Sequence, residues 1–162
     1  MFSKQKIRPC LWFDGNAEEA VNFYISVFGN SKILNVARAG DVGPWKKGAV
    51  AVTVMTFQLE GQEFMALNGG PQFKFNEAVS LLVNCETQAE VDDLWAKLGA
   101  GGKEIACGWL KDRFGLAWQI VPRILGEMML DEDRERADRV MKAMMGMVKL
   151  DIARLKQAYQ GR

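Results

Sequence analysis

An internal repeat constrains this fold most strongly, because the same order of predicted elements occurs twice along the chain. In the first half, a short apolar strand is broken by Asp14-Gly15, and a helix follows with Asn16 as its N-cap and Glu19 placed to reach back. The helix ends at Gly29, and three strands come after it. The expected strands of this half span residues 6–13, 31–39, 49–60 and 62–68.

The second half follows the same order. A strand over 78–85 leads into a helix that opens with Thr87 and Glu90 as a capping box. Strands are expected over 103–110 and 116–122, with room for one further short strand. Laying Asn16 on Thr87 sets an offset of 71 residues (87 minus 16). The same offset aligns Leu11 with Leu82, Phe13 with Asn84, Phe23 with Leu94 and Tyr24 with Trp95. These matches indicate a duplicated unit.

A unit with one helix for three or four strands implies a mostly antiparallel sheet whose helix covers one face. We therefore expect an α+β fold in which the opposite, concave faces of the two units enclose a cleft, a frequent place for small-molecule sites. Beyond Pro122 the apolar spacing predicts two amphipathic helices. The expected organisation is a paired domain over 1–130, with modules at about 4–68 and 76–122, and a C-terminal helical extension over 131–162.

Charge and composition narrow the class of partner. The 162 residues carry 21 basic and 20 acidic side chains, a formal net charge of +1, so no strong field attracts nucleic acid or an anionic membrane. Apolar stretches are interrupted well before the roughly 18 residues of a membrane span, and Met1 to Lys6 contain no signal-peptide core. Three cysteines without CxxC spacing are typical of reduced thiols. We expect a cytoplasmic protein with a small-molecule ligand or a protein partner.

The chain contains no histidine. Counting alone therefore excludes a Ser/His/Asp triad, a Cys/His nucleophile, an HExxH zinc site and a two-histidine iron site. Folds that bind a nucleotide-type cofactor commonly need a glycine-rich loop directly after a parallel strand. The one glycine cluster, 99–102, instead follows a helix and is interpreted as a C-cap and turn.

Three blocks of the sequence resemble a known family. PCLWFDGNAEEAVNFYISVFG, FNEAVSLLVNCETQAEVDDLW and CGWLKDRFGLAWQIVP are similar to the signature blocks of PhnB-like proteins, which are often labelled 3-demethylubiquinone 3-methyltransferase-like. That family belongs to the glyoxalase, bleomycin-resistance and dioxygenase (vicinal oxygen chelate) superfamily. The resemblance spans nearly the whole chain, including MMGMVKLDIARLKQAY. It implies paired βαβββ modules and commonly a homodimer.

Enzymes of that superfamily place one metal ligand at the start of each module's first strand and one on each module's last strand. By register these positions fall on Pro9, Ser80, Met65 (or Phe64) and Gln119. Proline has no ligand atom, methionine prefers soft metals, and serine and a neutral amide bind divalent ions weakly. We therefore expect neither a metal nor another cofactor.

The predicted cleft is largely apolar. On the repeat register its candidates are Pro9, Leu11, Phe13, Ser80, Leu82 and Asn84, joined by Met65, Trp118 and Gln119. An amide such as Gln119 can orient a polar ligand, and the alternative is a buried glutamine satisfied by neighbouring backbone. Strand tryptophans such as Trp118 face either the cleft or the core. The loop AGDVGPWKKG would supply Trp45 as a lid contact.

The leading hypothesis is a homodimeric, metal-independent small-molecule-binding protein. A first alternative is an enzyme of unknown substrate in the same cleft, including the methyl transfer of the family label. A second is a protein-interaction module that uses the methionine-rich C-terminal helices, since flexible thioethers suit adaptable surfaces. Packing of that segment across a homodimer or onto the sheet is the competing interpretation.

Overall fold

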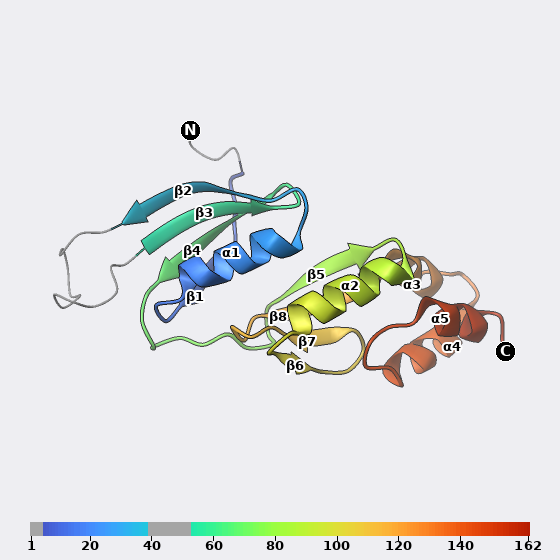
Figure 1. The fold of residues 1–162 in the computed structure, drawn as a ribbon. Coiled ribbons are helices and arrows are strands. Elements are labelled where there is room, and N and C mark those ends of the chain that lie inside the picture. The colour runs from blue at the N-terminus through green and yellow to red at the C-terminus, as the bar shows by residue number, and fades with distance from the viewer. Residues whose placement is uncertain (1–4, 39–52) are drawn as a thin grey trace. The chain divides into compact units, whose positions relative to one another are not determined.

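A computed structural model describes residues 5–38 and 53–162 and divides into two compact units, Met1–Lys74 and Phe75–Arg162. Each unit holds one four-stranded sheet with a helix, α1 or α2, between its first and second strands (Figure 1). The predicted α+β class with two βαβββ modules and C-terminal helices is therefore confirmed. No helix within the described part of the chain is long and apolar enough to cross a membrane.

The first unit follows the predicted element order. Its elements are β1 (Cys10–Phe13), α1 (Ala17–Val27), β2 (Lys32–Arg38), β3 (Thr53–Leu59) and β4 (Gln62–Asn68). The strands lie in the order β1-β4-β3-β2. β1 runs parallel to β4, whereas the other pairs are antiparallel, so the sheet is mixed. The start of the third predicted strand, together with Trp45, lies outside the described residues.

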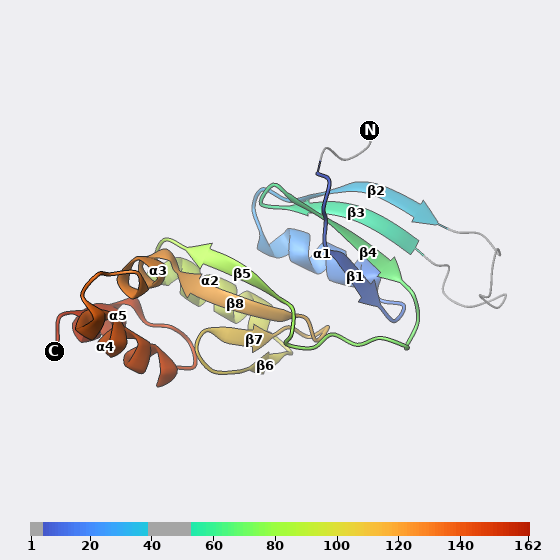
Figure 2. The same ribbon diagram turned by 180° about the vertical axis from the view of Figure 1, so that it is seen from behind.

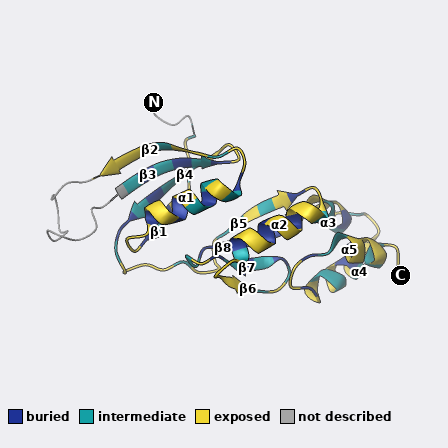
Figure 3. Ribbon diagram, viewed as in Figure 1, coloured by how far each residue is buried: buried dark blue, intermediate teal, exposed yellow. Residues whose placement is uncertain are grey.

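Helix α1 covers one face of this sheet. Its buried side chains recur at helical spacing and are Ala17, Ala20, Val21 and Tyr24. Strands β3 and β4 alternate buried and half-buried residues, and the buried set faces the helix. The rings of Phe57 and Phe64 stack there with centroids 5.3 Å apart. The core of this unit is therefore the apolar face of the sheet packed against the buried side of α1 (Figure 3).

The N-cap of α1 lies at the predicted residue, but the predicted capping bond is not made. Asn16 occupies the N-cap position, but its side chain makes no capping hydrogen bond. The backbone N–H of Ala17 instead donates to Oδ1 of Asn68 at 2.9 Å, in a buried position. Asn68 ends β4, which lies beside β1, so the sheet itself supplies the acceptor that the first turn of the helix needs.

The second unit repeats the topology with shorter strands. Its elements are β5 (Ser80–Cys85), α2 (Gln88–Gly99), β6 (Lys103–Glu104), β7 (Trp109–Lys111) and β8 (Ala117–Pro122), with the strands in the order β5-β8-β7-β6. The single strand predicted over 103–110 is in fact two strands. Cys107 and Gly108 break it because both have positive φ angles, 58° and 81°.

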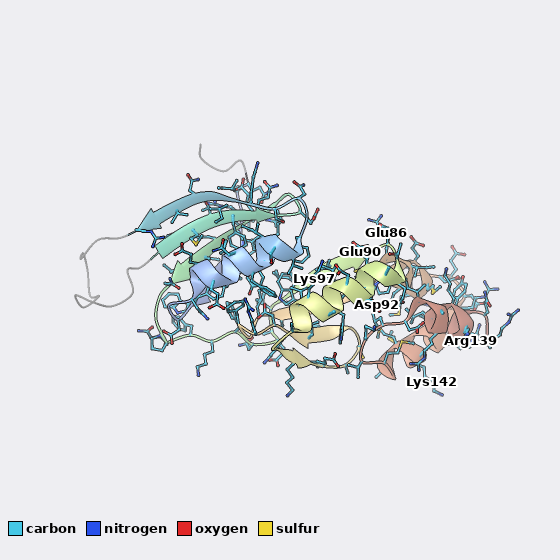
Figure 4. All side chains as sticks on the ribbon, in the orientation of Figure 1. Glu86, Glu90, Asp92, Lys97, Arg139 and Lys142 are labelled. Atoms are coloured by element: carbon cyan, nitrogen blue, oxygen red, sulfur yellow. The ribbon has the colours of Figure 1, made fainter. Side chains whose placement is uncertain are left out.

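Helix α2 begins much as predicted. The Thr87 side chain accepts from the Glu90 N–H at 3.2 Å, and Glu90 reaches back to the N–H of Glu86 at 2.7 Å, one residue earlier than a capping box requires. Figure 4 shows Glu86 and Glu90 near the start of α2. The helix buries Val91, Leu94, Trp95 and Leu98 against its sheet.

Three helices complete the second unit: α3 (Arg123–Met129), α4 (Arg134–Met145) and α5 (Ile152–Tyr159). α4 and α5 correspond to the two predicted amphipathic helices, and α3 is an additional one. Asp133 and Asp151 cap α4 and α5 with their carboxylates. The three helices share a core of Leu125, Met128, Val140, Met147, Leu150 and Leu155.

The loop between α4 and α5 is bound to the second sheet by its backbone. The N–H groups of Cys107 and Gly108 donate to the carbonyls of Met147 and Val148, each at 2.8 Å. The Gln88 amide bonds the same segment twice, to the Leu150 carbonyl and the Ile152 N–H. Cys107 and Gly108, which interrupt the predicted strand, are thus where the C-terminal segment attaches.

Candidate functional site

The two faces of the second sheet differ in what covers them. α2 lies on one face, where the indole N–H of Trp95 donates to Glu104 of β6 at 2.6 Å. Figure 2 shows the opposite face of each sheet, which α1 and α2 leave uncovered. In the second unit the core of α3, α4 and α5 packs against Val121 at the end of β8, on this opposite face. Strand alternation assigns alternate residues to this opposite face, here called the open face.

Cross-strand pairing brings two rows of side chains together on the open face of the second sheet. One row runs from Trp109 through Gln119 to Leu82. The next runs through Lys103, Lys111, Ala117 and Ser80. Asn84 lies on the same face, two residues beyond Leu82.

Gln119 and Ser80 form the polar centre of this face. The Gln119 amide Nε2 donates to Ser80 Oγ at 2.8 Å, and both residues are half-buried. The amide NH₂ group of Gln119 is therefore bonded to a side chain. The alternative interpretation of the sequence, in which neighbouring backbone satisfies this glutamine, does not describe this bond. The pair leaves the amide oxygen of Gln119 and the hydroxyl proton of Ser80 able to bind a further polar group.

Two lysines and a glutamate lie beside this pair. Lys103 and Lys111 are directly opposite each other in the β6–β7 pair. The Lys111 ammonium contacts the Glu77 carboxylate at 2.6 Å, with 27% of the lysine side chain exposed. This hydrogen bond from Lys111, with smaller contributions that include the charge of Lys103, lowers the pKa of Glu77.

Three of the predicted cleft residues belong to the core. Leu11, Phe13 and Trp118 are 6%, 3% and 2% exposed, and they lie on the helix-covered faces. The Trp118 indole N–H is bonded to the buried Asp112 carboxylate at 2.8 Å. The tryptophan that takes part in the open face is Trp109, which the sequence did not single out from the other strand tryptophans.

The error for Leu11 and Phe13 has a simple cause. Three residues, 14–16, separate β1 from α1, whereas only two, 86–87, separate β5 from α2. An offset taken from the helix starts is therefore one residue out in the strands, and a shift of one residue reverses the face of every side chain. Phe13 corresponds structurally to Cys85, and Cys10 corresponds to Leu82.

The remaining candidates divide between the units. Ser80, Leu82, Asn84 and Gln119 come together on the second sheet. Met65 lies beside Cys10 in the first unit, half-buried and on the face away from α1. Pro9 precedes β1 and is exposed, and its carbonyl accepts from the Met65 N–H at 2.9 Å. Their predicted role in ligand binding stays a prediction.

The donor atoms at these positions do not fit a hard divalent cation. Met65 offers a thioether, Ser80 a hydroxyl that already accepts from an amide, and Gln119 a single neutral carbonyl. Within residues 5–38 and 53–162, no cluster of three or more Cys, Asp or Glu side chains is arranged to hold a metal ion. The chemistry offered by the open face is hydrogen bonding and charge.

Two of the three cysteines, Cys85 and Cys10, have raised pKa values. Cys85 is fully buried on the helix side, and desolvation, with help from Glu90 and Glu86, raises its pKa to about 12. Burial also raises the pKa of the Cys10 thiol. Thiols that hold their protons in this way are poor nucleophiles at neutral pH.

Comparison with known proteins now identifies the family. Residues 5–121 match the family described as 3-demethylubiquinone-9 3-methyltransferase. The chain belongs to this family. A PhnB protein from Bacillus cereus whose name carries the same methyltransferase label is 38% identical, covering 73% of this chain and 99% of that one with a TM-score of 0.65. The resemblance seen in the sequence is thus confirmed.

More distant solved structures share the fold of this 3-demethylubiquinone-9 3-methyltransferase family member. A protein from Pseudomonas aeruginosa is 24% identical over 71% of this chain and 95% of that one, with a TM-score of 0.59. The fosfomycin resistance protein FosX from Listeria monocytogenes, solved with Mn(II) and a dihydroxypropylphosphonic acid, is 11% identical over 72% and 90% of the two chains, with a TM-score of 0.54. These likenesses show that the chain shares its fold with both proteins. No curated protein matches significantly.

Proposed function

We propose that this PhnB-like protein binds a small molecule directly, without a metal ion, on the open face of its second sheet. The hydrogen bond between Gln119 and Ser80 carries the proposal, because it holds two polar groups in place while leaving an acceptor and a donor for a ligand. Superfamily proteins bind small molecules, as the dihydroxypropylphosphonic acid in the FosX structure illustrates for that protein.

The surroundings of this pair support binding of a partly apolar ligand. Leu82 is 52% exposed beside Gln119, and Trp109 lies on the other side of the amide in the same row. Neighbouring strands are roughly 4.8 Å apart, so this row presents about 10 Å of apolar surface with one polar group at its centre. Small-molecule sites commonly combine apolar surface with a few placed polar groups.

A thermal-shift screen of small molecules on the full chain, in buffer with EDTA, tests the proposal. Binding of any ligand to the folded state raises the melting temperature. We expect Gln119→Ala to weaken the hits by about tenfold, the equivalent of one buried hydrogen-bonding group. Gln157→Ala, on the exposed surface of α5, is the matched control and leaves binding unchanged.

Two results would redirect the proposal. Hits that appear only when Mn²⁺ replaces EDTA would contradict metal-free binding. A large stabilisation by S-adenosylmethionine would favour the methyl transfer of the family label over simple binding. The same screen therefore separates the binding protein from the enzyme alternative.

Homodimer formation and a reducing, cytoplasmic location are further parts of this proposal. The three cysteines are all free thiols, which is typical of a reducing compartment. Light scattering on the purified chain should give about twice its 18.1 kDa mass, and a monomer at micromolar concentration would contradict the dimer.

A further inference from the structure

Hydrogen-bond donors predominate on the open face of the second sheet. Lys103 and Lys111 bring two ammonium groups, and Ser80 offers its hydroxyl proton. The indole N–H of Trp109 has no hydrogen-bond partner within the described residues. The anionic group that lies beside these donors is the carboxylate of Glu77. A ligand that matches this face is therefore rich in acceptors.

The charges of Lys103, Lys111 and Glu77 also favour a ligand that is rich in acceptors. Like charges directly opposite each other on neighbouring strands are destabilising, and Lys103 and Lys111 are such a pair. Glu77 neutralises only one of the two, so the cluster keeps a charge of +1. The Glu77 side chain is half-exposed, at 51%, and comes from the segment before β5. Its carboxylate can leave Lys111 without disturbing the sheet.

We propose that the ligand is a small aromatic carboxylate, whose carboxylate replaces that of Glu77 at Lys111 while its ring lies against Trp109. This rests on the proposed function and names the ligand class for the same face. The two rows are two residues apart along β7, roughly 7 Å, so one molecule contacts Lys111 in one row and Trp109 in the next. Ser80 and Gln119 then lie beside the body of the ligand.

A monoanion fits this face better than a phosphate dianion. Lysine acts as a point charge, whereas phosphate recognition commonly uses the forked donors of arginine. The arginine nearest in sequence, Arg113, lies over the ring of Phe114, 5.0 Å from its centroid. The surplus of one positive charge equals the charge of one carboxylate.

Benzoate and benzamide make a matched pair of probes, since they differ in charge and share the ring. Titrations of the full chain are followed by the NMR signal of the Trp109 indole N–H, assigned with Trp109→Phe. We expect benzoate to bind at least about fivefold more tightly than benzamide, the worth of one partly exposed ion pair. Lys111→Gln should remove this preference. Glu77→Gln, which removes the competing carboxylate, should strengthen benzoate binding and leave benzamide unchanged.

The control is Lys97→Gln on α2, because Lys97 is also paired with a carboxylate, that of Asp93 at 2.7 Å, but lies on the outer side of the helix (Figure 4). It should leave the preference for benzoate intact. Equal affinities for the two probes, no binding of benzoate, or a preference that persists in Lys111→Gln would each overturn the proposed ligand class. Neutral ligands that bind through Gln119 while benzoate does not would leave the proposed function standing.

Discussion

Replacing Asp112, a buried carboxylate in the turn between β7 and β8, should strongly destabilise the second unit. The Asp112 side chain is 3% exposed, and its carboxylate accepts hydrogen bonds from donors of the residues that follow it. They come from the Phe114 N–H at 2.8 Å, the Leu116 N–H at 3.1 Å and the Trp118 indole at 2.8 Å. These bonds fix the turn between β7 and β8, and hence the pairing that sets Trp109 opposite Gln119.

The magnitude follows from the donors that Asp112→Ala would leave behind. The Leu116 and Trp118 donors are buried, and each buried donor without a partner costs about 1–3 kcal/mol. We therefore expect a loss of about 2–6 kcal/mol in the free energy of unfolding. Asp112→Asn should lose less, because its amide oxygen can still accept while its NH₂ group opposes one donor.

Urea unfolding followed by the Trp109 indole NMR signal reports on the second unit specifically. A double-mutant cycle with Trp118→Phe isolates the indole bond, and we expect a coupling of about 1 kcal/mol between the two sites. The exposed Asp138→Ala on α4 serves as the control for loss of a carboxylate. A loss below about 1 kcal/mol for Asp112→Ala, or strict additivity in the cycle, would refute this account of the turn.

Three further predictions concern the rest of the chain. Asn68→Ala should cost about 1–2 kcal/mol and Asn16→Ala under about 0.5 kcal/mol, since only Asn68 caps α1; equal losses in urea unfolding would contradict this. Truncation after Leu130 should unfold the second unit, because it removes four of the six buried residues in the helical core and the backbone partners of Cys107 and Gly108. Loss of the dispersed amide NMR signals of this unit would show the unfolding. A truncated chain that stays folded would instead support a separable interaction module. Folding raises the pKa of Cys85 from 9.0 to about 12, so the protonated thiol favours the folded state. Stability that is present below pH 9 should therefore be lost as the pH rises from about 9 towards 12. Cys85→Ala should remove this part of the alkaline loss, and an unchanged dependence of the unfolding free energy on pH would contradict the prediction.

The order of elements was predictable because it depends on local patterns. Apolar spacing and the Thr87 cap indicate the helices, and the repeated order of elements indicates two units. The faces of the strands were not predictable from the helix offset, since the connection before α1 is one residue longer than that before α2. A comparison of strand ends, in place of helix starts, would have assigned Leu11 and Phe13 to the core.

Contacts between distant residues account for the other differences. Asn68 caps a helix that begins 51 residues earlier, and nothing near Asn16 signals this. The ion pair of Lys111 with Glu77 forms because β5, β8 and β7 lie side by side in the sheet. No local pattern links these two residues with Gln119. A turn between the strands expected over 103–110 and 116–122 follows from the sequence, and counting back from it would have placed Trp109 and Lys111 on one face.

Binding to the open face of the second sheet is tested most directly by amide NMR of the full chain in EDTA, titrated with the strongest hit of the thermal-shift screen. We expect chemical-shift changes concentrated at Ser80, Leu82, Trp109 and Gln119, which share that face. Shifts confined to α4 and α5, or shifts that appear only after Mn²⁺ replaces EDTA, would contradict it.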